Sequence, residues 1–402
     1  MRADFVPLLL GNDINAYSMA RAFHEAYGVK TLVYGMYASG PCCGSSIIDY
    51  RICPKNDDPE VVLRNVQTVC GEYPDRKVLV LGCGDNYLTA IAENLPHFPG
   101  NAIAPYVDLE KMEGLIHKAR FYELCARHDI GYPATFVYQK EMGHDFTLPF
   151  DAPYVVKPAE SATYWDHPFS SQKKAYILHS RAEVEQVVDE IYANGYGDDL
   201  IIQDFIPGDD SNMRVLTSYS GEDGTVRLMC LGHVLLEEHT PHAVGNHAVI
   251  VTEHEPALCE TMRRLLDAIA FTGFSNFDIK YDCRDGTYKV FELNCRQGRS
   301  NYYVTGAGYN LARWLVEDRI DHKSLPFTIA AEKSLWRVVP KKVAYTYIAK
   351  EHHAVMDELA AAEGAVNPIF YAADKGKLRK LRMLRNHWRY NQLYAAVMEK
   401  AT

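Results

Sequence analysis

The first hundred residues alternate between strand-like and helix-like stretches, and this alternation limits the fold more than any other feature of the sequence. Apolar stretches at 6–10, 31–34 and 77–81 predict buried strands. Helices are expected between them at 15–27 and 59–70. Strands that alternate with helices form parallel sheets covered by helices. The sequence therefore predicts an α/β fold for this part of the chain.

Two glycines follow the third of these strands, in the stretch Gly82-Cys83-Gly84. The stretch is similar to the first motif of methyltransferases that use S-adenosylmethionine. It also matches half of a dinucleotide-binding fingerprint, with Tyr87 at the place of the third glycine. A tight turn between a strand and a helix needs glycine as well. The turn is the simpler interpretation, and a methyltransferase is kept as an alternative function.

Residues from about 108 to 327 contain more strands and fewer helices. Helices are expected at 108–128, at 255–271 and after the capping box at Ser180, which opens a helix that ends near residue 194. A hairpin over 274–293 is expected to turn at Asp285-Gly286. The other strands expected in this part are 134–138, 153–157, 200–205, 213–219 and 225–236.

The chain ends in a basic segment with helical spacing. Seven Lys or Arg lie between residues 375 and 389, interleaved with leucines every third residue and one tryptophan. The spacing predicts a helix with one apolar face. We expect that face to pack on the protein, with the basic face in solvent. Docking on an anionic surface or partner is the alternative. The apolar residues concerned are Leu378, Leu381, Leu384 and Trp388.

Composition excludes several classes of protein. The net charge of -10 argues against broad nucleic-acid binding, which requires a basic face. No stretch approaches the roughly 20 apolar residues of a membrane span, and the N-terminus lacks the layout of a signal peptide. Ten cysteines without a zinc-binding spacing are typical of buried thiols in a reducing compartment. We therefore expect a cytoplasmic protein; a homodimer is one option for its assembly.

The clearest chemical signal lies in the hairpin. Side chains alternate along a strand, so Glu292, Asn294 and Arg296 are expected on one side, with Asp278 across the hairpin on the same face. Two carboxylates and an amide oxygen suit Mg²⁺, with Mn²⁺ as the other option. An arginine beside them can neutralise a transferring phosphoryl group. The simpler interpretation, a polar outer face of an antiparallel sheet, explains these four residues together less well.

This hairpin resembles the metal hairpin of the ATP-grasp family, which has an acidic residue followed a strand later by Glu-x-Asn-x-Arg. Two upstream lysines match the family's ATP lysines in the same order, namely Lys118 before Gly131-Tyr132-Pro133 and Lys157 in a strand. A lysine on a rigid strand provides a fixed charge for phosphate oxygens. The resemblance implies that Lys157 and Arg296 act in phosphoryl transfer.

Further matches and two departures lie between the lysines and the hairpin. Residues 203–206 resemble the hinge that holds adenine, and Asp210 stands where the family places an acid on the ribose. The family usually has Glu at the position of Gln203. The loop at 159–174, which should cover the phosphates, begins with a stretch that lacks glycine; Ser161, Thr163 and Lys173 or Lys174 are the candidates there. The hinge residues are Gln203, Asp204, Phe205 and Ile206.

The resemblance implies an order of domains. A Rossmann-like domain over 1–107 is expected to precede two ATP-grasp subdomains of α+β type, at 108–198 and 199–326. A helical extension at 327–402 lies outside the similarity. In this order the first domain helps to bind the acceptor substrate.

The best-matching branch looks like the carboxylate–amine ligases related to D-aspartate ligase and to carbamoyl-phosphate synthetase. It implies an ATP-dependent ligase that activates a carboxylate as an acyl phosphate and joins it to an amine. D-aspartate is one candidate acid, and Arg214 and Arg299 are candidates for holding the substrate carboxylate. A biotin carboxylase fits the same ATP site, although the chain lacks an Ala-Met-Lys-Met acceptor. A protein that binds ATP without turnover is the non-enzymatic alternative.

Overall fold

The computed structural model describes residues 2–240, 243–362 and 364–398 and divides the chain into two compact units. The first unit comprises Met1–Leu109, Asp210–Asn276 and Asn294–Thr402. The second unit comprises Glu110–Asp209 and Phe277–Leu293. The four domain ranges implied by the resemblance stay a prediction. The C-terminal extension and the N-terminal domain belong to the same compact unit.

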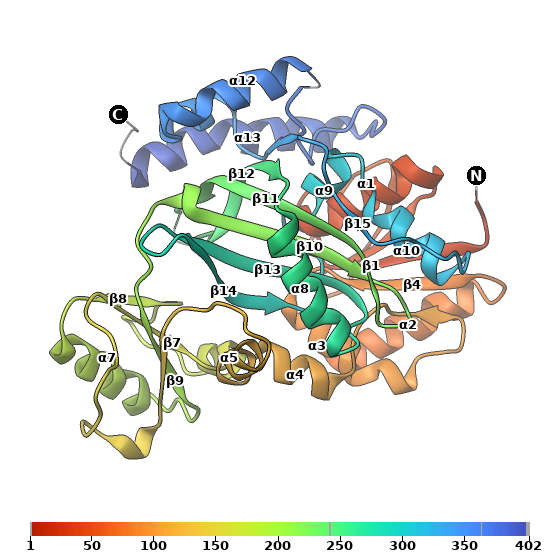
Figure 1. Cartoon of the computed structure of the whole chain (residues 1–402). Helices are drawn as coiled ribbons and strands as arrows, with labels where there is room; N and C mark the ends of the chain where they lie inside the picture. The colour runs from red at the N-terminus through yellow and green to blue at the C-terminus, as the bar shows by residue number, and fades with distance from the viewer. Residues whose placement is uncertain (1, 241–242, 363, 399–402) are drawn as a thin grey trace. The chain divides into compact units, whose positions relative to one another are not determined.

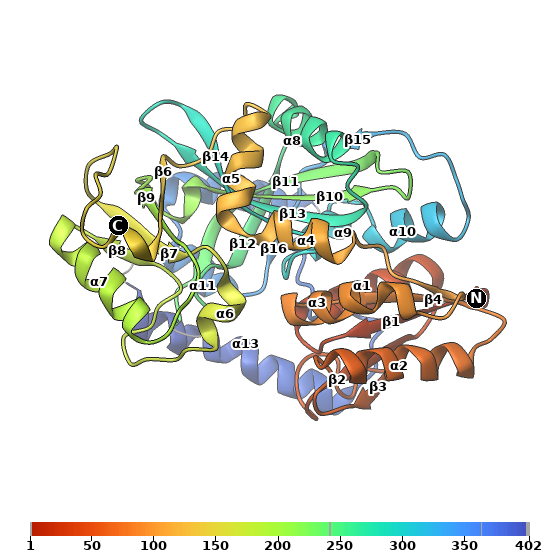
Figure 2. The same ribbon diagram turned by 90° about the horizontal axis from the view of Figure 1, so that it is seen from below.

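The first unit contains the predicted parallel α/β domain (Figures 1 and 2). Its five-stranded sheet has the order β3-β2-β1-β4-β5, so the chain reverses direction across the sheet between β1 and β4. The central strand β1 is fully buried, and Leu9 lies opposite Val33 on one side and Leu81 on the other. The strands are β1 (Phe5–Leu10), β2 (Thr31–Gly35), β3 (Ile48–Ile52), β4 (Lys77–Gly82) and β5 (Ala102–Ile103).

The first helix of this domain begins after a capping residue and ends at a glycine. Asp13 caps α1 (Ile14–Tyr27) by accepting from the backbone N–H of Ala16 at 3.2 Å, and the helix ends at Gly28, whose φ of 67° suits glycine. The helix α1 packs against α9 and α10, whereas α2 and α3 pack against each other. The bounds of these other helices are α2 (Pro59–Glu72), α3 (Asp85–Asn94), α9 (Tyr302–Gly306) and α10 (Leu311–Arg319).

The first unit also contains an antiparallel sheet with the order β13-β10-β11-β12-β16 (Figure 1). Both faces are buried, so its central strands are nearly continuous runs of buried residues. The helix α8 (Pro256–Ala268) packs on β11. The strands are β10 (Met213–Ser220), β11 (Val226–Glu238), β12 (Asn246–Glu253), β13 (Gly273–Asp282), β15 (Thr328–Ile329), which pairs with β11, and β16 (Leu335–Arg337).

The second unit has a four-stranded antiparallel sheet with the order β6-β9-β7-β8. The predicted cap of α7 is confirmed, because Ser180 accepts from the N–H of Glu183 at 3.3 Å. The later part of β13 and nearly all of β14 (Thr287–Asn294) complete this unit. Its other elements are α4 (Leu109–Ile116), which starts at the boundary, α5 (Lys118–Arg127), β6 (Thr135–Tyr138), β7 (Tyr154–Pro158), α6 (Ser161–Trp165), β8 (Tyr176–Leu178), α7 (Arg181–Ala193) and β9 (Leu200–Asp204).

The C-terminal extension contains α11 (Lys341–Tyr347), α12 (His353–Ala362) and α13 (Lys377–Val397). The basic helix exists as predicted, but its expected orientation is wrong. The buried residues of α13 are Arg379, Met383 and Tyr394, whereas its row of leucines is exposed. The first turns of α13 dock beside β2 and β3 through polar contacts (Figure 2). No helix within the described residues is both long and apolar enough to cross a membrane.

Candidate active site

Three lysines and two carboxylates come together in the second unit. Lys118 opens α5, Lys157 lies on β7 and Lys174 lies in the loop before β8. All three lysines attract Glu292 of β14, which also hydrogen-bonds with Asp278 of β13. The structure thus brings together both ATP lysines and both acidic metal ligands expected from the sequence. Of the two lysines expected in the phosphate loop, Lys174 is the one that attracts Glu292.

Local structure fixes the two lysines that the sequence placed first. The backbone N–H of Lys118 donates to the carbonyl of Ala159 at 3.1 Å, which ties the start of α5 to the end of β7. Lys157 lies on a strand that pairs with β8 on one side and β9 on the other. A lysine on such a strand changes position little, as a phosphate-binding charge requires.

The electrostatics of this cluster favour an anionic ligand. Burial lowers the pKa of Lys157 to about 7, and the charge of Lys118 adds to this effect against the opposing attraction of Glu292. Burial alone would raise the pKa of Glu292, but Lys174, Lys118, the hydrogen bond with Asp278 and Lys157 together hold it below its ordinary value. Lysine charges that repel one another in this way gain stability when phosphate oxygens bind between them.

Tyr122 is a site residue that the sequence analysis missed. The Lys157 ammonium donates to the Tyr122 hydroxyl at 3.0 Å, and that hydroxyl donates to the carbonyl of Phe291 at 2.7 Å. Tyr122 therefore links Lys157 of β7 to the strand that carries Glu292. Its spacing offered a signal, because Lys118 and Tyr122 are four residues apart on α5 and so share one face of the helix.

The structure shows what glutamine does at the first position of the predicted adenine hinge. The Thr135 hydroxyl donates to the carbonyl of Pro133 at 2.6 Å, so its oxygen is left to accept from the Gln203 amide at 2.7 Å. The buried Gln203 amide also hydrogen-bonds with Tyr122. A glutamate side chain has no such donor when it is ionised. The departure from the family pattern therefore follows from the neighbour of Gln203.

We expect Gln203→Glu to lower the free energy of unfolding by about 1–3 kcal/mol, because a buried acceptor would face the Thr135 oxygen without a proton between them. Thermal and urea unfolding of the variant measure the change. In a Thr135→Ala background the same substitution should cost less, because the opposing oxygen is gone. Equal stability of Gln203→Glu and the unaltered chain would contradict this explanation.

The remaining hinge residues are held by side chains from the hairpin. Arg284 makes two contacts with the Asp204 carboxylate, at 3.2 and 2.6 Å. Lys280 donates to the carbonyl of Ile206 at 2.9 Å and lies 5.5 Å from the ring centroid of Phe205. These contacts fix the backbone of the stretch that the resemblance assigns to adenine. Arg284 and Lys280 act on the hinge across a long sequence separation, which left no local signal.

A cavity of about 350 Å³ lies beside this hinge. None of the three lysines and neither Asp278 nor Glu292 lines the cavity, so the cavity lies outside the cluster of lysines and carboxylates. Its lining residues are Tyr132, Pro133, Ala134, Thr135, Asp204, Ile206, Asp282, Arg284, Asp285 and Lys289.

The donor set of the hairpin fits a magnesium ion bound together with nucleotide phosphates. Asp278 and Glu292 adjoin closely enough to hydrogen-bond, which gives two hard oxygen donors. Asn294 is two residues beyond Glu292 on β14, and its Oδ1 accepts from Arg296 at 3.4 Å. No group of three or more His, Cys, Asp or Glu within the described residues is arranged to hold a metal. Mg²⁺ needs few protein ligands when phosphates and water supply the others.

Arg296 lies in the first unit and faces the Rossmann-like domain. It makes two contacts with Asp85 at the start of α3, at 2.6 and 2.9 Å. The next residue, Gln297, is fully buried and donates to the carbonyl of Gly82 at 3.0 Å. A Cβ on Gly82 would lie 3.0 Å from the backbone nitrogen of Leu88, so this position leaves little room for a side chain. The glycine motif is thus a tight turn filled by protein side chains, which argues against the methyltransferase alternative.

Arg299 has a free donor, whereas Arg214 does not. One Arg299 nitrogen donates to Glu238 at 2.9 Å, and its Nη1 is buried without a hydrogen-bond partner. The buried guanidinium of Arg214 forms an ion pair with Glu253 and donates to the carbonyls of Ser211 and Met213. Of the two arginines expected to hold substrate, Arg299 is therefore the one with a donor left for a ligand.

Asp210, the residue expected at the ribose, belongs to the first unit. Its carboxylate accepts from the backbone N–H of Glu237 at 2.8 Å and pairs with His239 at 2.8 Å. The hydrogen bond with Asp210 raises the pKa of His239. The ribose role of Asp210 stays a prediction.

Comparison with solved structures places the fold in a known class. N5-carboxyaminoimidazole synthetase from Staphylococcus aureus, complexed with ADP, matches with a TM-score of 0.61 at 12% identity, over 90% of this chain and 87% of that chain. An L-amino acid ligase from Bacillus licheniformis matches with a TM-score of 0.52 at 16% identity, over 79% of this chain and 75% of that chain. No family model matches the sequence. The fold is that of the ATP-grasp enzymes.

The class is therefore an ATP-dependent ligase that forms carbon–nitrogen bonds from a carboxylate and an amine. A curated D-aspartate ligase of Enterococcus faecium (strain Aus0004) is 41% identical over 395 residues, which cover 94% of this chain and 93% of that relative. The chain belongs to the D-aspartate ligase family.

Proposed function

We propose that the chain activates D-aspartate with ATP and joins the activated acid to an amine. The 41% identity to a D-aspartate ligase along nearly the whole chain supports the choice of acid. The cluster of Lys118, Lys157, Lys174, Asp278 and Glu292 supports the use of ATP, because it combines phosphate-binding charges with oxygen ligands for a divalent ion.

Each residue of the second unit has a distinct part in this proposal. The hinge from Gln203 to Ile206 holds the adenine through its backbone. Lys118 and Lys157 hold the phosphates, and Tyr122 keeps the Lys157 ammonium in place by accepting its hydrogen bond at 3.0 Å. Lys174 approaches from the loop before β8 and adds charge where the family normally has small residues.

Asp278, Glu292 and Asn294 would hold Mg²⁺, which neutralises phosphate charge when it is bound. ADP and magnesium accompany a solved neighbour, the biotin carboxylase domain of 2-oxoglutarate carboxylase from Hydrogenobacter thermophilus. That likeness covers the fold alone. We propose Mg²⁺ as the working ion, with Mn²⁺ as a substitute, since both ions take carboxylate, carbonyl and water oxygens.

The chemistry follows from positioning and charge neutralisation. A carboxylate oxygen of the acid attacks the γ-phosphorus, and the bond to the leaving ADP oxygen breaks, which gives an acyl phosphate. The amine nitrogen then attacks the acyl carbon, phosphate leaves and the nitrogen loses a proton, which gives an amide. Lys157 stabilises the negative charge that moves in the first step, and the same role for Arg296 stays a prediction from the resemblance. No covalent bond to the protein is needed.

The first unit offers a place for the acid at the carboxyl ends of β1 and β4. Ligands of open α/β sheets bind where the strand order reverses, and that point lies between these two strands. Arg296 reaches Asp85 beside the turn after β4. Burial raises the pKa of the Asp13 carboxyl group, which follows β1. The positive charges of Arg299 and Arg296 lower this pKa, but by less. We propose that the free Nη1 of Arg299 holds a substrate carboxylate.

Hydroxylamine can test the choice of acid without knowledge of the natural amine, because it converts an acyl phosphate to a stable hydroxamate. With ATP and Mg²⁺, we expect D-aspartate to yield its hydroxamate together with an equal amount of ADP. L-aspartate and D-glutamate should yield much less. Hydroxamate from another amino acid but not from D-aspartate would correct the substrate and keep the ligase. No ADP release with any acid would favour the alternative of a nucleotide-binding protein without turnover.

We also infer that the chain works in the cytoplasm, since its ten cysteines are free thiols, most of them buried. A homodimer stays a prediction that the molecular mass in solution would test.

A further inference from the structure

The outward side of α13 carries an apolar row that nothing in the catalytic proposal uses. This outer row consists of Leu378, Leu381, Leu384 and Trp388, which are 83%, 67%, 47% and 60% exposed. At about 100° per residue, the last three lie within about 60° of one another around the helix axis. Four large apolar side chains on one face of one helix are more than the scattered single residues of an ordinary surface.

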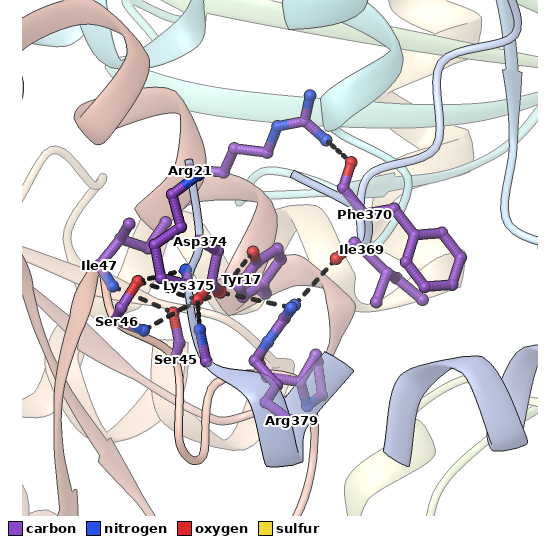
Figure 3. A network of polar contacts seen from close by, with 12 residues as sticks. Tyr17, Arg21, Ser45, Ser46, Ile47, Ile369, Phe370, Asp374, Lys375 and Arg379 are labelled. Atoms are coloured by element: carbon purple, nitrogen blue, oxygen red, sulfur yellow. Dashed lines mark hydrogen bonds and ion pairs between the residues drawn. The ribbon is translucent and has the colours of Figure 1, made fainter. Parts of the chain in front are cut away.

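The opposite side of α13 is firmly docked, so the outer row is not a misplaced core face. Figure 3 shows the buried Asp374 at the centre of this docking, where its carboxylate accepts from Ser45 at 2.8 Å and from Tyr17 at 2.9 Å. Arg379 pairs with Asp374 at 3.3 Å and donates to the carbonyl of Ile369 at 2.9 Å.

The docking continues along the helix. Arg382 donates to the carbonyl of Gly40 at 2.9 Å, His387 pairs with the carbonyl of Val338 at 2.8 Å, and the Tyr394 hydroxyl donates to the carbonyl of Glu237 at 2.7 Å. Rotating α13 to bury the leucines would break these contacts and leave buried charges without partners.

The charged side chains that α13 places beside the outer row are all basic. The helix contains no Asp or Glu, in a chain whose net charge is -10. Lys380 lies beside Leu384 around the helix axis, whereas Arg385 and Arg389 lie beside Leu381 and Leu378. Lys375 and Lys377, at the start of the helix, are exposed as well. A partner that covers this face must therefore be anionic and must also accept apolar side chains.

We propose that this face binds the surface of an anionic phospholipid bilayer, with α13 lying flat and its outer row inserted among the acyl chains. An apolar row with a tryptophan, flanked by lysine and arginine, is the arrangement found in helices that lie in a membrane interface. A symmetric contact with a second copy would bring the two basic rims face to face. Nucleic acid would pair with the basic rim but leave the leucines in water.

Vesicle flotation of the full chain tests this proposal. We expect the protein to float with vesicles of equal parts phosphatidylglycerol and phosphatidylcholine, and to stay behind with phosphatidylcholine alone. Leu381→Ser combined with Trp388→Ser should abolish flotation, while Ile52→Ser, at an exposed position on β3, should have no effect. Arg385→Glu should weaken partition at least about fivefold, and Lys30→Glu should not. Hydroxamate formation in solution should be unchanged in all these variants, because they lie outside the catalytic cluster.

Three outcomes would overturn the proposal. The first is equal flotation with neutral and anionic vesicles, and the second is flotation of the serine double variant. The third is a protein that ignores both vesicles and halves its mass in solution when Leu381 and Trp388 are replaced, which would assign the face to a second copy. A blue shift of fluorescence with anionic vesicles that is lost in Trp388→Phe would place this tryptophan in the bilayer and support the proposal.

Discussion

Glu292→Ala is expected to reduce D-aspartate-dependent ADP release at least about a thousandfold, with the fold intact. Glu292 is the carboxylate on which three lysines and Asp278 converge, so its loss removes an oxygen ligand of the metal ion and the acid that orders the lysines. Release of ADP in the presence of hydroxylamine measures the loss of the first chemical step, independently of the amine. The melting temperature of the variant reports whether the fold survives.

Asp285→Ala is the matched control for this experiment. Asp285 lies at the turn of the same hairpin and forms an ion pair with Lys289 at 2.8 Å, with much of its side chain in solvent. An exposed pair of this kind contributes about 1 kcal/mol or less. ADP release by the control should therefore stay within about threefold of the unaltered chain. Near-normal turnover by folded Glu292→Ala would remove the metal assignment and leave the ligase family in place.

The core of the site was predictable because it depends on local rules. Alternation along a strand placed Asp278 and Glu292 on one face of the hairpin, and the structure confirms that the two side chains meet. The two lysines that the resemblance assigns to ATP were predicted from their order along the chain, and both attract Glu292. Three of the five strands in the parallel sheet of the first unit, β1, β2 and β4, followed from alternating strands and helices, with ends within one or two residues of those expected. The strands β3 and β5 were not predicted.

What the sequence could not show are contacts between distant segments. The pairing of Gln203 with Thr135 depends on the register of β6 against β9, which no local pattern specifies. Lys280 and Arg284 act on the hinge across more than 70 residues. Such contacts arise only when the second unit folds.

The predicted orientation of α13 was wrong for a different reason. Periodicity identifies an apolar face but not the surface that the face meets. Here the protein side of the helix is polar, because Arg379 finds the buried Asp374 and Arg382 finds backbone carbonyls. Asp374 lies only five residues before Arg379, but the other groups of this contact lie far away in sequence, in the loop at 40–46. A basic helix with leucines therefore docks through its arginines and turns its leucines outward.

ATP binding is expected to weaken as the pH rises above about 7, because Lys157 loses its proton there. Burial and the charge of Lys118 lower the pKa of this lysine to about 7 in the free protein. Phosphate oxygens bind the protonated form and raise its pKa, so binding takes up a proton at pH 8. The dissociation constant should increase up to about tenfold per pH unit between the free and bound pKa values. Calorimetry in buffers of different ionisation enthalpy measures the uptake directly.

Lys157→Arg separates this cause from any titration of ATP itself. A guanidinium stays protonated across this range, so the variant should take up no proton at Lys157's position and its affinity for ATP should depend far less on pH. Lys157→Met, which has no charge, should bind ATP weakly at every pH and lose about a hundredfold or more in kcat/KM. Lys173→Arg, on an exposed neighbour in the same loop as Lys174, should keep the pH dependence of the unaltered chain. The same pH dependence in Lys157→Arg as in the unaltered chain would show that another group titrates, and Lys157 would then be a phosphate ligand without a lowered pKa.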